Sequence, residues 1–168
     1  MWKAKELPPK DVLHSLFEYK DGNIYHKTSH SGVCAGQLAG SHKPTYAVVK
    51  ISNNPYKLHR VIFMMHHGYC AENIDHINGN KHDNRIENLR SATQAENKRN
   101  KALDIRNKSG IKGVYWHYKA KKWIAKIRLN GKNKHLGTFS DLSLAQEFME
   151  LAREMVHGKF ANHGQFTA

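Results

Sequence analysis

Residues 73–79 read NIDHING, and they hold the densest group of chemically capable side chains in the chain. Asp75 and His76 are adjacent, and Asn78-Gly79 follows them as a turn signal. Successive side chains of a strand point to opposite faces, so a single strand cannot aim both Asp75 and His76 squarely at one target. The strand must therefore end or bend near His76, which Asn78-Gly79 permits.

The segment that follows continues this pattern. A short strand is predicted over residues 86–90. Thr93-Gln94-Ala95-Glu96 has the form of a capping box, which predicts that a helix begins after Thr93. Asn97 then lies in the first helical turn. Beyond it the apolar pattern thins and the composition becomes basic and polar, which predicts a linker over residues 99–109.

The N-terminal part, predicted as one domain over residues 1–98, combines strands with one helix. Short strands are expected at 17–19, 24–25 and 46–51, with Asp21-Gly22 as a hairpin turn between the first two. A helix is expected from Leu58, with Gly68 as its stop. Its buried face is predicted from the i, i+3, i+4, i+7 spacing of Leu58, Val61, Ile62 and Met65.

A second small domain is predicted over residues 110–161, and a tail is predicted over residues 162–168. Within 123–129 apolar and mainly polar residues alternate, which places Lys126 and Arg128 together on one face of a strand. Further strands are expected at 113–118 and 133–139, with Asn130-Gly131 as a tight turn. A helix should follow Asp141, stop at Gly158 and carry an apolar stripe of Leu144, Phe148, Leu151 and Met155. The fold class is therefore α+β, ending in a three-stranded antiparallel sheet covered by one helix.

Charge points to a polyanionic partner. The chain carries 27 Lys and Arg against 14 Asp and Glu, a formal net charge of +13. Thirteen of the basic residues and one acid, Asp104, lie between Lys98 and Lys134. Nucleic acid leads the candidate partners, and the alternative is a merely solvated basic surface.

Other features exclude several classes of protein. Two distant cysteines, Cys34 and Cys70, indicate neither a disulfide framework nor a thiolate zinc site. No apolar run approaches the roughly 20 residues that span a bilayer, and residues 1–10 lack a signal-peptide region. We expect a soluble, cytoplasmic protein with no membrane association, and nothing implies a protein partner.

The chemistry of residues 75–97 suits phosphodiester hydrolysis. Histidine, with an unperturbed pKa of about 6.5, is a suitable general base, and oxygen ligands from Asp75 and Asn97 favour a hard divalent cation. Each residue also has a structural alternative. His76 is one of thirteen histidines and can simply be packed, while the asparagines can be caps, turn formers or solvent-facing residues.

The motif as a whole resembles the phage-type HNH homing endonucleases. The matching stretches are His59-Arg60, residues 74–80 and 83–90, and Asn97, and the resemblance covers roughly residues 11–100. It implies a ββα-metal nuclease fold with one Mg²⁺ or Mn²⁺. Many relatives have His where this chain has Asn97, which makes this the HNN variant and disfavours zinc or nickel.

The resemblance also implies a role for each site residue. His76 is the general base, Asp75 and Asn97 hold the metal, and Asn88 orients the loop that bears His76. Double-stranded DNA is then hydrolysed to a 3′-hydroxyl and a 5′-phosphate, in the cytoplasm of a bacterial host if a phage encodes the chain. Arg60 either braces a phosphate or pairs with an acid such as Glu87.

Residues 109–161 resemble the plant ethylene-response-factor DNA-binding domain, on KGVYW at 112–116, WIAKIR at 123–128 and HLGTF at 135–139. In that family the sheet enters the major groove. The matching positions here are Lys112, Tyr115, His117, Lys126, Arg128, Asn133 and His135. Arg106 and Lys108 in the linker are expected to follow the phosphate backbone.

Three functions remain open on the sequence. The first is a site-specific endonuclease of the homing type, for which a nick is the simpler outcome if the protein is a monomer. The second is a regulator that binds DNA through the same sheet on a degenerate nuclease scaffold. The third is a nonspecific nuclease. An intact set of Asp75, His76, Asn88 and Asn97 favours an enzyme over the regulator, and a dedicated C-terminal domain favours a specific enzyme.

Overall fold

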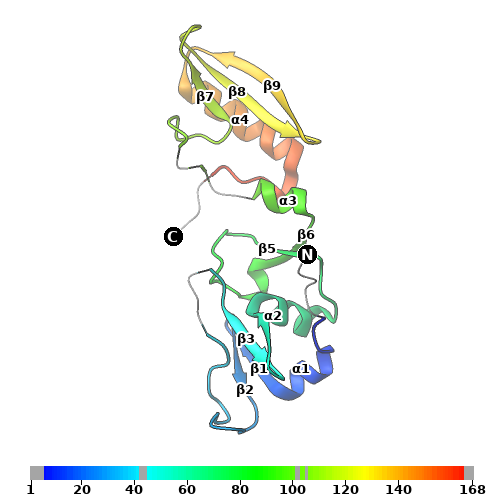
Figure 1. The fold of residues 1–168 in the computed structure, drawn as a ribbon. Coiled ribbons are helices and arrows are strands. Elements are labelled where there is room, and N and C mark those ends of the chain that lie inside the picture. The colour runs from blue at the N-terminus through cyan, green and yellow to red at the C-terminus, as the bar shows by residue number, and fades with distance from the viewer. Residues whose placement is uncertain (1–5, 42–44, 101–102, 105, 165–168) are drawn as a thin grey trace. The chain divides into compact units, whose positions relative to one another are not determined.

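A computed structural model describes residues 6–41, 45–100, 103–104 and 106–164 (Figure 1). The chain forms two compact units, residues 1–93 and 94–168, and each is described here by itself. No helix in the described ranges is long and apolar enough to cross a membrane. Each unit has its own hydrophobic core.

The first unit contains three separate two-stranded antiparallel sheets and two α-helices. Its elements are α1 (Lys10–Leu16), β1 (Phe17–Lys20), β2 (Asn23–His26), β3 (Val48–Ile51), β4 (Asn54–Lys57), α2 (Leu58–His67), β5 (Asn73–His76), the 3-10 helix η1 (Ile86–Asn88) and β6 (Leu89–Ala92). The strands pair as β1–β2, β3–β4 and β5–β6.

Helix α2 is the centre of the first core and confirms the predicted helix. All four residues of its predicted apolar face are buried: Leu58, Val61, Ile62 and Met65. Gly68 ends the helix in the left-handed conformation at φ 75°, which a residue without a Cβ adopts without strain. Ile74 of β5 and Leu89 of β6 belong to the same core, so the packing around α2 fixes the β5–β6 hairpin.

Three elements of this unit differ from the prediction. Helix α1 has seven residues, too few to show a clear helical period. Strand β4 contains Pro55, and the β3–β4 turn uses Ser52 and Asn53 at φ 47° and 63° in place of a glycine signal. The strand predicted over 86–90 is wrong in its first half, where η1 forms and the Asn88 amide donates to Arg85 O at 2.9 Å.

The second unit confirms a three-stranded antiparallel sheet with a covering helix. Its elements are α3 (Gln94–Arg99), β7 (Val114–His117), β8 (Lys122–Leu129), β9 (Lys132–Phe139), α4 (Leu142–His157) and the 3-10 helix η2 (Gly158–Phe160). The strand order is β7-β8-β9, and α4 packs mainly on β8 (Figure 1). Asn130 and Gly131 form the β8–β9 turn at φ 49° and 77°, both in the region that a tight hairpin requires.

The ends of α4 are as predicted, but its buried face is not. Asp141 accepts a hydrogen bond from the Leu144 amide at 2.9 Å as the N-cap, and Gly158 is the C-cap. The buried residues of α4 are Ala145, Met149 and Arg153. The predicted stripe is exposed instead, at 59% for Leu144, 44% for Phe148, 62% for Leu151 and 87% for Met155.

Close packing explains this rotation of α4. Small Ala145 is fully buried and lets the helix approach the sheet. A Cβ on Gly113 would come within 2.8 Å of Met149 Cε, so Met149 fills the space that this glycine leaves open. The Arg153 guanidinium donates to the main-chain oxygen of Lys112. Together these contacts outweigh the burial that the larger apolar stripe would gain.

The predicted boundaries at residues 98, 109 and 161 stay predictions, and two residues beside them are well packed. Asn100, in the predicted linker, and Asn162, in the predicted tail, are both buried. Asn162 Nδ2 donates to Asn100 Oδ1 at 3.1 Å. Helix α3 contacts η2 and belongs to the same compact unit as the sheet.

Candidate active site

Asp75 and His76 are the last two residues of β5, and both are 5% exposed. They pair with Arg90 and Leu89 of β6. Because the strand ends at His76, the chain turns there, and Gly79 N donates to His76 O at 2.9 Å. The structure therefore ends β5 where the sequence required an end or a bend.

Arg90 is a partner of Asp75 that the sequence analysis missed. Its Nη2 lies 2.8 Å and its Nε 3.0 Å from Asp75 Oδ2. The guanidinium side chain is 14% exposed, so this ion pair is largely shielded from water. Only the strand register, which places Arg90 opposite Asp75, reveals the pair. Arg90 fixes the orientation of the carboxylate that is the predicted metal ligand.

Asn84 contacts His76 directly. Its Oδ1 lies 3.1 Å from His76 Nε2, and Asn84 is only 2% exposed. An amide oxygen only accepts hydrogen bonds, so this contact places the imidazole proton on Nε2. In that tautomer the lone pair of the ring lies on Nδ1, the nitrogen that can take a proton. In the sequence, Asn84 is one of several asparagines that can form turns, and no local signal indicates its contact with His76.

Burial also favours the neutral form of His76. Desolvation lowers the pKa of His76 below 6.5, although the hydrogen bond to Asn84 and the carboxylates of Asp75 and Asp83 act in the opposite direction. The imidazole is therefore unprotonated near pH 7. A general base must be in that state to accept a proton from water.

A second histidine packs against the first. The His59 and His76 ring centroids are 5.1 Å apart in an edge-on arrangement, and the Tyr46 ring completes the cluster at 5.2 Å from His59 and 6.4 Å from His76. Burial, then the neighbouring His76, lower the pKa of His59 to about 3. His59 is thus uncharged at neutral pH, and its ring packs against the side of His76. In the sequence, His59 stands out only as part of the stretches that resemble a known family.

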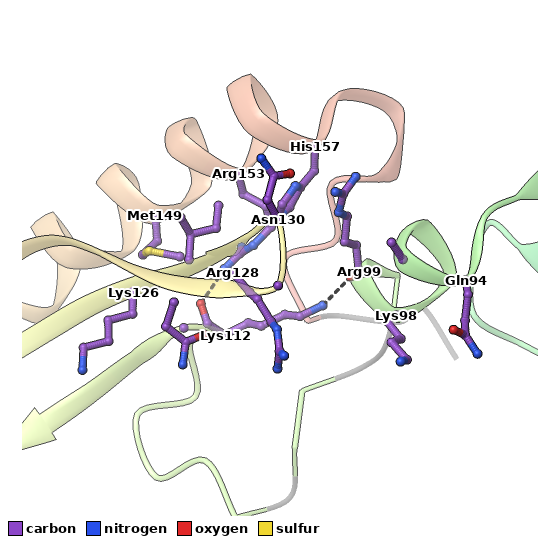
Figure 2. Close-up of a pocket in the computed structure, with 15 residues that line it drawn as sticks. Gln94, Lys98, Arg99, Lys112, Lys126, Arg128, Asn130, Met149, Arg153 and His157 are labelled. Carbon is purple, nitrogen blue, oxygen red and sulfur yellow. Dashed lines mark hydrogen bonds between the residues drawn. The ribbon is translucent and has the colours of Figure 1, made fainter.

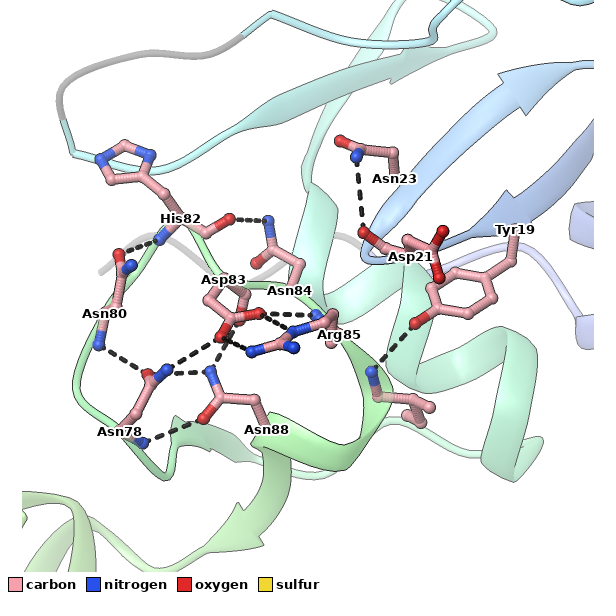
Figure 3. Close-up of polar contacts among 11 residues, drawn as sticks. Tyr19, Asp21, Asn23, Asn78, Asn80, His82, Asp83, Asn84, Arg85 and Asn88 are labelled. Atoms are coloured by element: carbon pink, nitrogen blue, oxygen red, sulfur yellow. Dashed lines mark hydrogen bonds and ion pairs between the residues drawn. The ribbon is translucent and has the colours of Figure 1, made fainter. Parts of the chain in front are cut away.

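The loop after His76 is held by asparagines (Figure 3). Asn78 N donates to Asn88 Oδ1 at 2.9 Å, and Asn88 Nδ2 returns a bond to Asn78 Oδ1 at 2.9 Å. Asn88 Nδ2 also donates to Asp83 O at 2.7 Å. Asn88 thus joins the two ends of the loop that follows His76.

Asp83 and Arg85 stiffen the same loop. Arg85 Nη2 lies 2.8 Å from Asp83 Oδ2, and Arg85 Nε lies 2.9 Å from Asp83 Oδ1. These hydrogen bonds from Arg85 lower the pKa of Asp83 to about 2, so its carboxylate is ionised at neutral pH. Asp83 Oδ2 also accepts from Asn78 Nδ2 at 2.8 Å, which joins the ion pair to the asparagine network.

The N-terminal hairpin supports this loop from outside. Ile86 N donates to the Tyr19 hydroxyl at 3.1 Å (Figure 3). Gly22, in the β1–β2 turn at φ 81°, lies so close that a Cβ there would be 2.8 Å from Arg85 N. Residues about 60 positions away thus set where the loop after His76 lies.

Asn97 and Arg60, the other two residues predicted for the nuclease site, have no contact among those described above. Asn97 is half-buried on α3, and this helix belongs to the second unit. Arg60 Nη1 donates to the main-chain oxygen of Glu72 at 3.1 Å. The ion pair considered between Arg60 and Glu87 does not form among the described residues.

The donor set at Asp75 fits a hard cation better than zinc. No group of three or more His, Cys, Asp or Glu in the described ranges is arranged to hold a metal ion. Asp75 offers a buried carboxylate, and oxygen ligands of this kind suit hard cations. This oxygen chemistry fits Mg²⁺ or Mn²⁺.

Six of the candidate DNA-binding residues of the second unit lie on the strands of its sheet: Tyr115, His117, Lys126, Arg128, Asn133 and His135. Lys126 and Arg128 are exposed on β8, while Ala125 and Ile127 between and beside them are buried, as the alternation predicted. The strand register sets Lys126 opposite His135 and Arg128 opposite Asn133. The Lys126 ammonium lies 5.0 Å from the centre of the Tyr115 ring on β7.

The remaining candidates are less uniform. His117 Nδ1 accepts from Ala120 N at 3.1 Å and so stabilises the β7–β8 turn. Arg106 pairs with Asp104 at 2.8 Å, and both side chains are exposed. Lys108 lies in the same connecting segment, whereas Lys112 is half-buried and donates to Arg99 O at 2.7 Å.

Comparison with known proteins assigns the class. Residues 56–99, from β4 through α3, match the HNH endonuclease family, so the chain contains an HNH endonuclease domain. The chain belongs to the same protein family as Protein 3.8 of Escherichia phage T7. The two are 34% identical over 88 residues, which cover 52% of this chain and 72% of that protein. No solved structure is significantly similar to the chain.

Proposed function

We propose that the protein is a site-specific DNA endonuclease of the homing type, which hydrolyses one phosphodiester bond per site and leaves a 3′-hydroxyl and a 5′-phosphate. One observation carries this proposal. His76, inside the HNH match, is buried, neutral and hydrogen-bonded through Nε2 to Asn84. A phage-type nuclease would meet double-stranded DNA in the cytoplasm of its bacterial host.

His76 acts as the general base in this proposal. With its proton on Nε2, Nδ1 takes a proton from the attacking water, and the Asn84 oxygen then stabilises the imidazolium that forms. The His59 ring restricts the orientation of the imidazole from the side. Asn88 acts at a distance, since it ties the ends of the loop that carries Asn84.

Asp75 and Asn97 are the residues that would hold Mg²⁺ or Mn²⁺ in the ββα-metal arrangement that the HNH resemblance implies. The cation would supply Lewis-acid stabilisation of the negative charge on the scissile phosphate. Arg90 contributes by holding Asp75 Oδ2 in one direction. Arg60 remains a candidate phosphate contact, although its guanidinium also donates to Glu72 O.

The sheet of the second unit is proposed to select the target. Lys126 and Arg128 project from β8, and Tyr115, His117, Asn133 and His135 lie on the two neighbouring strands. An exposed sheet face with this spacing can enter a major groove, as in the plant domain that residues 109–161 resemble. Arg106, Lys108 and Lys112 are proposed to contact the phosphate backbone.

A plasmid-nicking assay tests the enzyme directly. With Mg²⁺ we expect wild type to convert supercoiled plasmid to open circles that DNA ligase reseals, because ligase requires a 3′-hydroxyl and a 5′-phosphate. His76→Ala should abolish nicking and leave DNA binding within about threefold, since a general base contributes to the transition state and little to the ground state.

His82→Ala is the matched control, because His82 is an exposed histidine in the same loop. It should nick at the wild-type rate. Tight DNA binding by wild type without any nicking would leave the regulator as the function. Cleavage without sequence preference would leave the nonspecific nuclease.

A further inference from the structure

The second unit contains a large pocket that is distinct from the predicted nuclease site and includes only some of the predicted DNA-binding residues. It has a volume of about 870 Å³ and is lined by α3, the segment before β7, strand β8, the β8–β9 turn, the start of β9 and α4 (Figure 2). Helix α3 also bears Asn97, and β8 bears the exposed residues Lys126 and Arg128. One helix that lines the pocket thus bears a predicted metal ligand, and one strand that lines it bears two predicted DNA-contact residues.

Positive charge dominates this pocket. Six Lys and Arg side chains line it: Lys98, Arg99, Lys112, Lys126, Arg128 and Arg153. No acidic residue of the described chain is among its lining residues. Burial, then the nearby Arg153, lower the pKa of Lys112 to about 8. Burial, and after it the nearby Arg99, Arg153 and Lys112, lower the pKa of His157.

The deeper cations are rigidly held. Arg153 is 3% exposed, and it donates to Lys112 O and contacts His163 Nδ1 at 3.1 Å. Lys112 Nζ donates to Arg99 O at 2.7 Å, which ties the segment before β7 to α3 (Figure 2). These bonds go to neutral acceptors, and they hold the two cationic side chains in place.

A crowded set of fixed cations with a low-dielectric wall attracts anions strongly. The pocket is much larger than one phosphate group, so it suits a chain of phosphates. We propose that this pocket binds the phosphodiester backbone of one strand of the DNA substrate, beside the bases that β8 reads. This inference rests on the proposed function. It adds Lys98 and Arg99 to the DNA-binding residues, and the buried Arg153 contributes positive charge to the pocket.

The salt dependence of DNA binding tests this site. Affinity is measured by fluorescence anisotropy without divalent metal, over a range of KCl concentrations, for wild type and Arg99→Gln. Each lost phosphate contact lowers the slope of log affinity against log salt by about 0.9. We expect Arg99→Gln to lower the slope by about that amount on specific and random DNA alike. Lys98→Gln, an exposed change on the same helix, should do the same and guards against a folding defect.

Lys50→Gln is the matched control, because Lys50 is an exposed lysine on β3 in the other unit. It should keep the wild-type slope. Unchanged slopes in both pocket variants would overturn the inference. If wild type nicks plasmid in the same preparation, that result leaves the proposed function intact, whereas absent nicking with altered slopes would reject only the enzyme.

Single methylphosphonate substitutions in the DNA give the position of the contact. Neutralising one or two adjacent phosphates should weaken wild-type binding and have no further effect on Arg99→Gln. Pyrophosphate serves as the competing small anion. If pyrophosphate protects the pocket from lysine modification while every methylphosphonate affects wild type and Arg99→Gln equally, the site holds a free anion and the inference fails.

Discussion

Asn84 Oδ1 and His76 Nε2 lie 3.1 Å apart in the interior of the first unit, although eight residues separate them in the chain. The intervening loop closes because Asn78 and Asn88 bond each other twice. One asparagine pair thus shapes the loop, and a third asparagine uses that shape to set the tautomer of the histidine.

Replacing Asn84 with alanine should lower kcat by roughly tenfold to a hundredfold, a part of the 10²–10⁴-fold that general-base catalysis contributes. The substrate affinity should stay nearly constant. In ¹⁵N NMR spectra, wild-type His76 should show a protonated Nε2, and Asn84→Ala should show a mixture of tautomers. Asn80→Ala changes an exposed asparagine of the same loop and should keep the wild-type kcat. An unaltered kcat in Asn84→Ala would exclude the positioning role.

His59 should make the first unit sensitive to acid. Its folded pKa of about 3 lies below the unfolded value of about 6.5, so the unfolded chain binds the proton more tightly. The stabilisation by neutral His59 is complete above pH 6.5, and it should fall by about 1.4 kcal/mol per pH unit between 6.5 and 3.

Hydrogen exchange of the α2 amides at pH 7, 6 and 5 measures this effect as a free energy of opening. His59→Leu should lose less of that free energy on acidification than wild type. Parallel pH profiles for the two proteins would show that His59 does not cause the acid sensitivity.

Alanine substitutions at Gly22 and Gly32 distinguish a steric clash with the catalytic loop from backbone strain alone. Gly22→Ala would place a methyl group 2.8 Å from Arg85 N, whereas Gly32, at nearly the same φ of 82°, has no atom within 4 Å of its position for a Cβ. Both changes carry the strain of a left-handed alanine, about 1 kcal/mol. Only Gly22→Ala should also reduce the nicking rate, and equal rates in the two variants would contradict the support by the β1–β2 turn.

The rotation of α4 gives a stability test. Met149→Ala should destabilise the second unit by about 2–5 kcal/mol, since it empties a buried site, and Leu151→Ala by less than about 1 kcal/mol. Urea unfolding followed by tryptophan fluorescence reports on this unit through Trp116 and Trp123. A larger effect from Leu151→Ala would restore the buried stripe that the sequence predicted.

The fold was predictable where a local signal fixes it. Asn130-Gly131 demands its turn, and the spacing of Leu58, Val61, Ile62 and Met65 demands a helix with one buried face. The face of α4 was not predictable, because it depends on the absent Cβ of Gly113 in another element. Seven-residue α1 and proline-bearing β4 give signals too weak to separate from loops.

The site, like the fold, was predictable only where residue types and local spacing determine it. Asp75, His76 and Asn88 were singled out because their residue types and spacing suit the chemistry, and the structure brings them into one loop and strand end. Arg90, Asn84 and His59 were not, since their contacts arise from strand register, loop closure and helix packing. Site residues whose role depends on their spacing along the chain can be predicted from the sequence. Site residues whose role depends on tertiary contacts cannot.

The concentration of positive charge between Lys98 and Lys134 bears on how quickly a rare target is found. Sequence-independent attraction keeps a protein near DNA after each unsuccessful encounter, so that it slides and hops along the duplex. The search then proceeds partly in one dimension. The time needed to reach a single site in a long genome is consequently governed by ionic strength and by the length of flanking DNA, before any base is read.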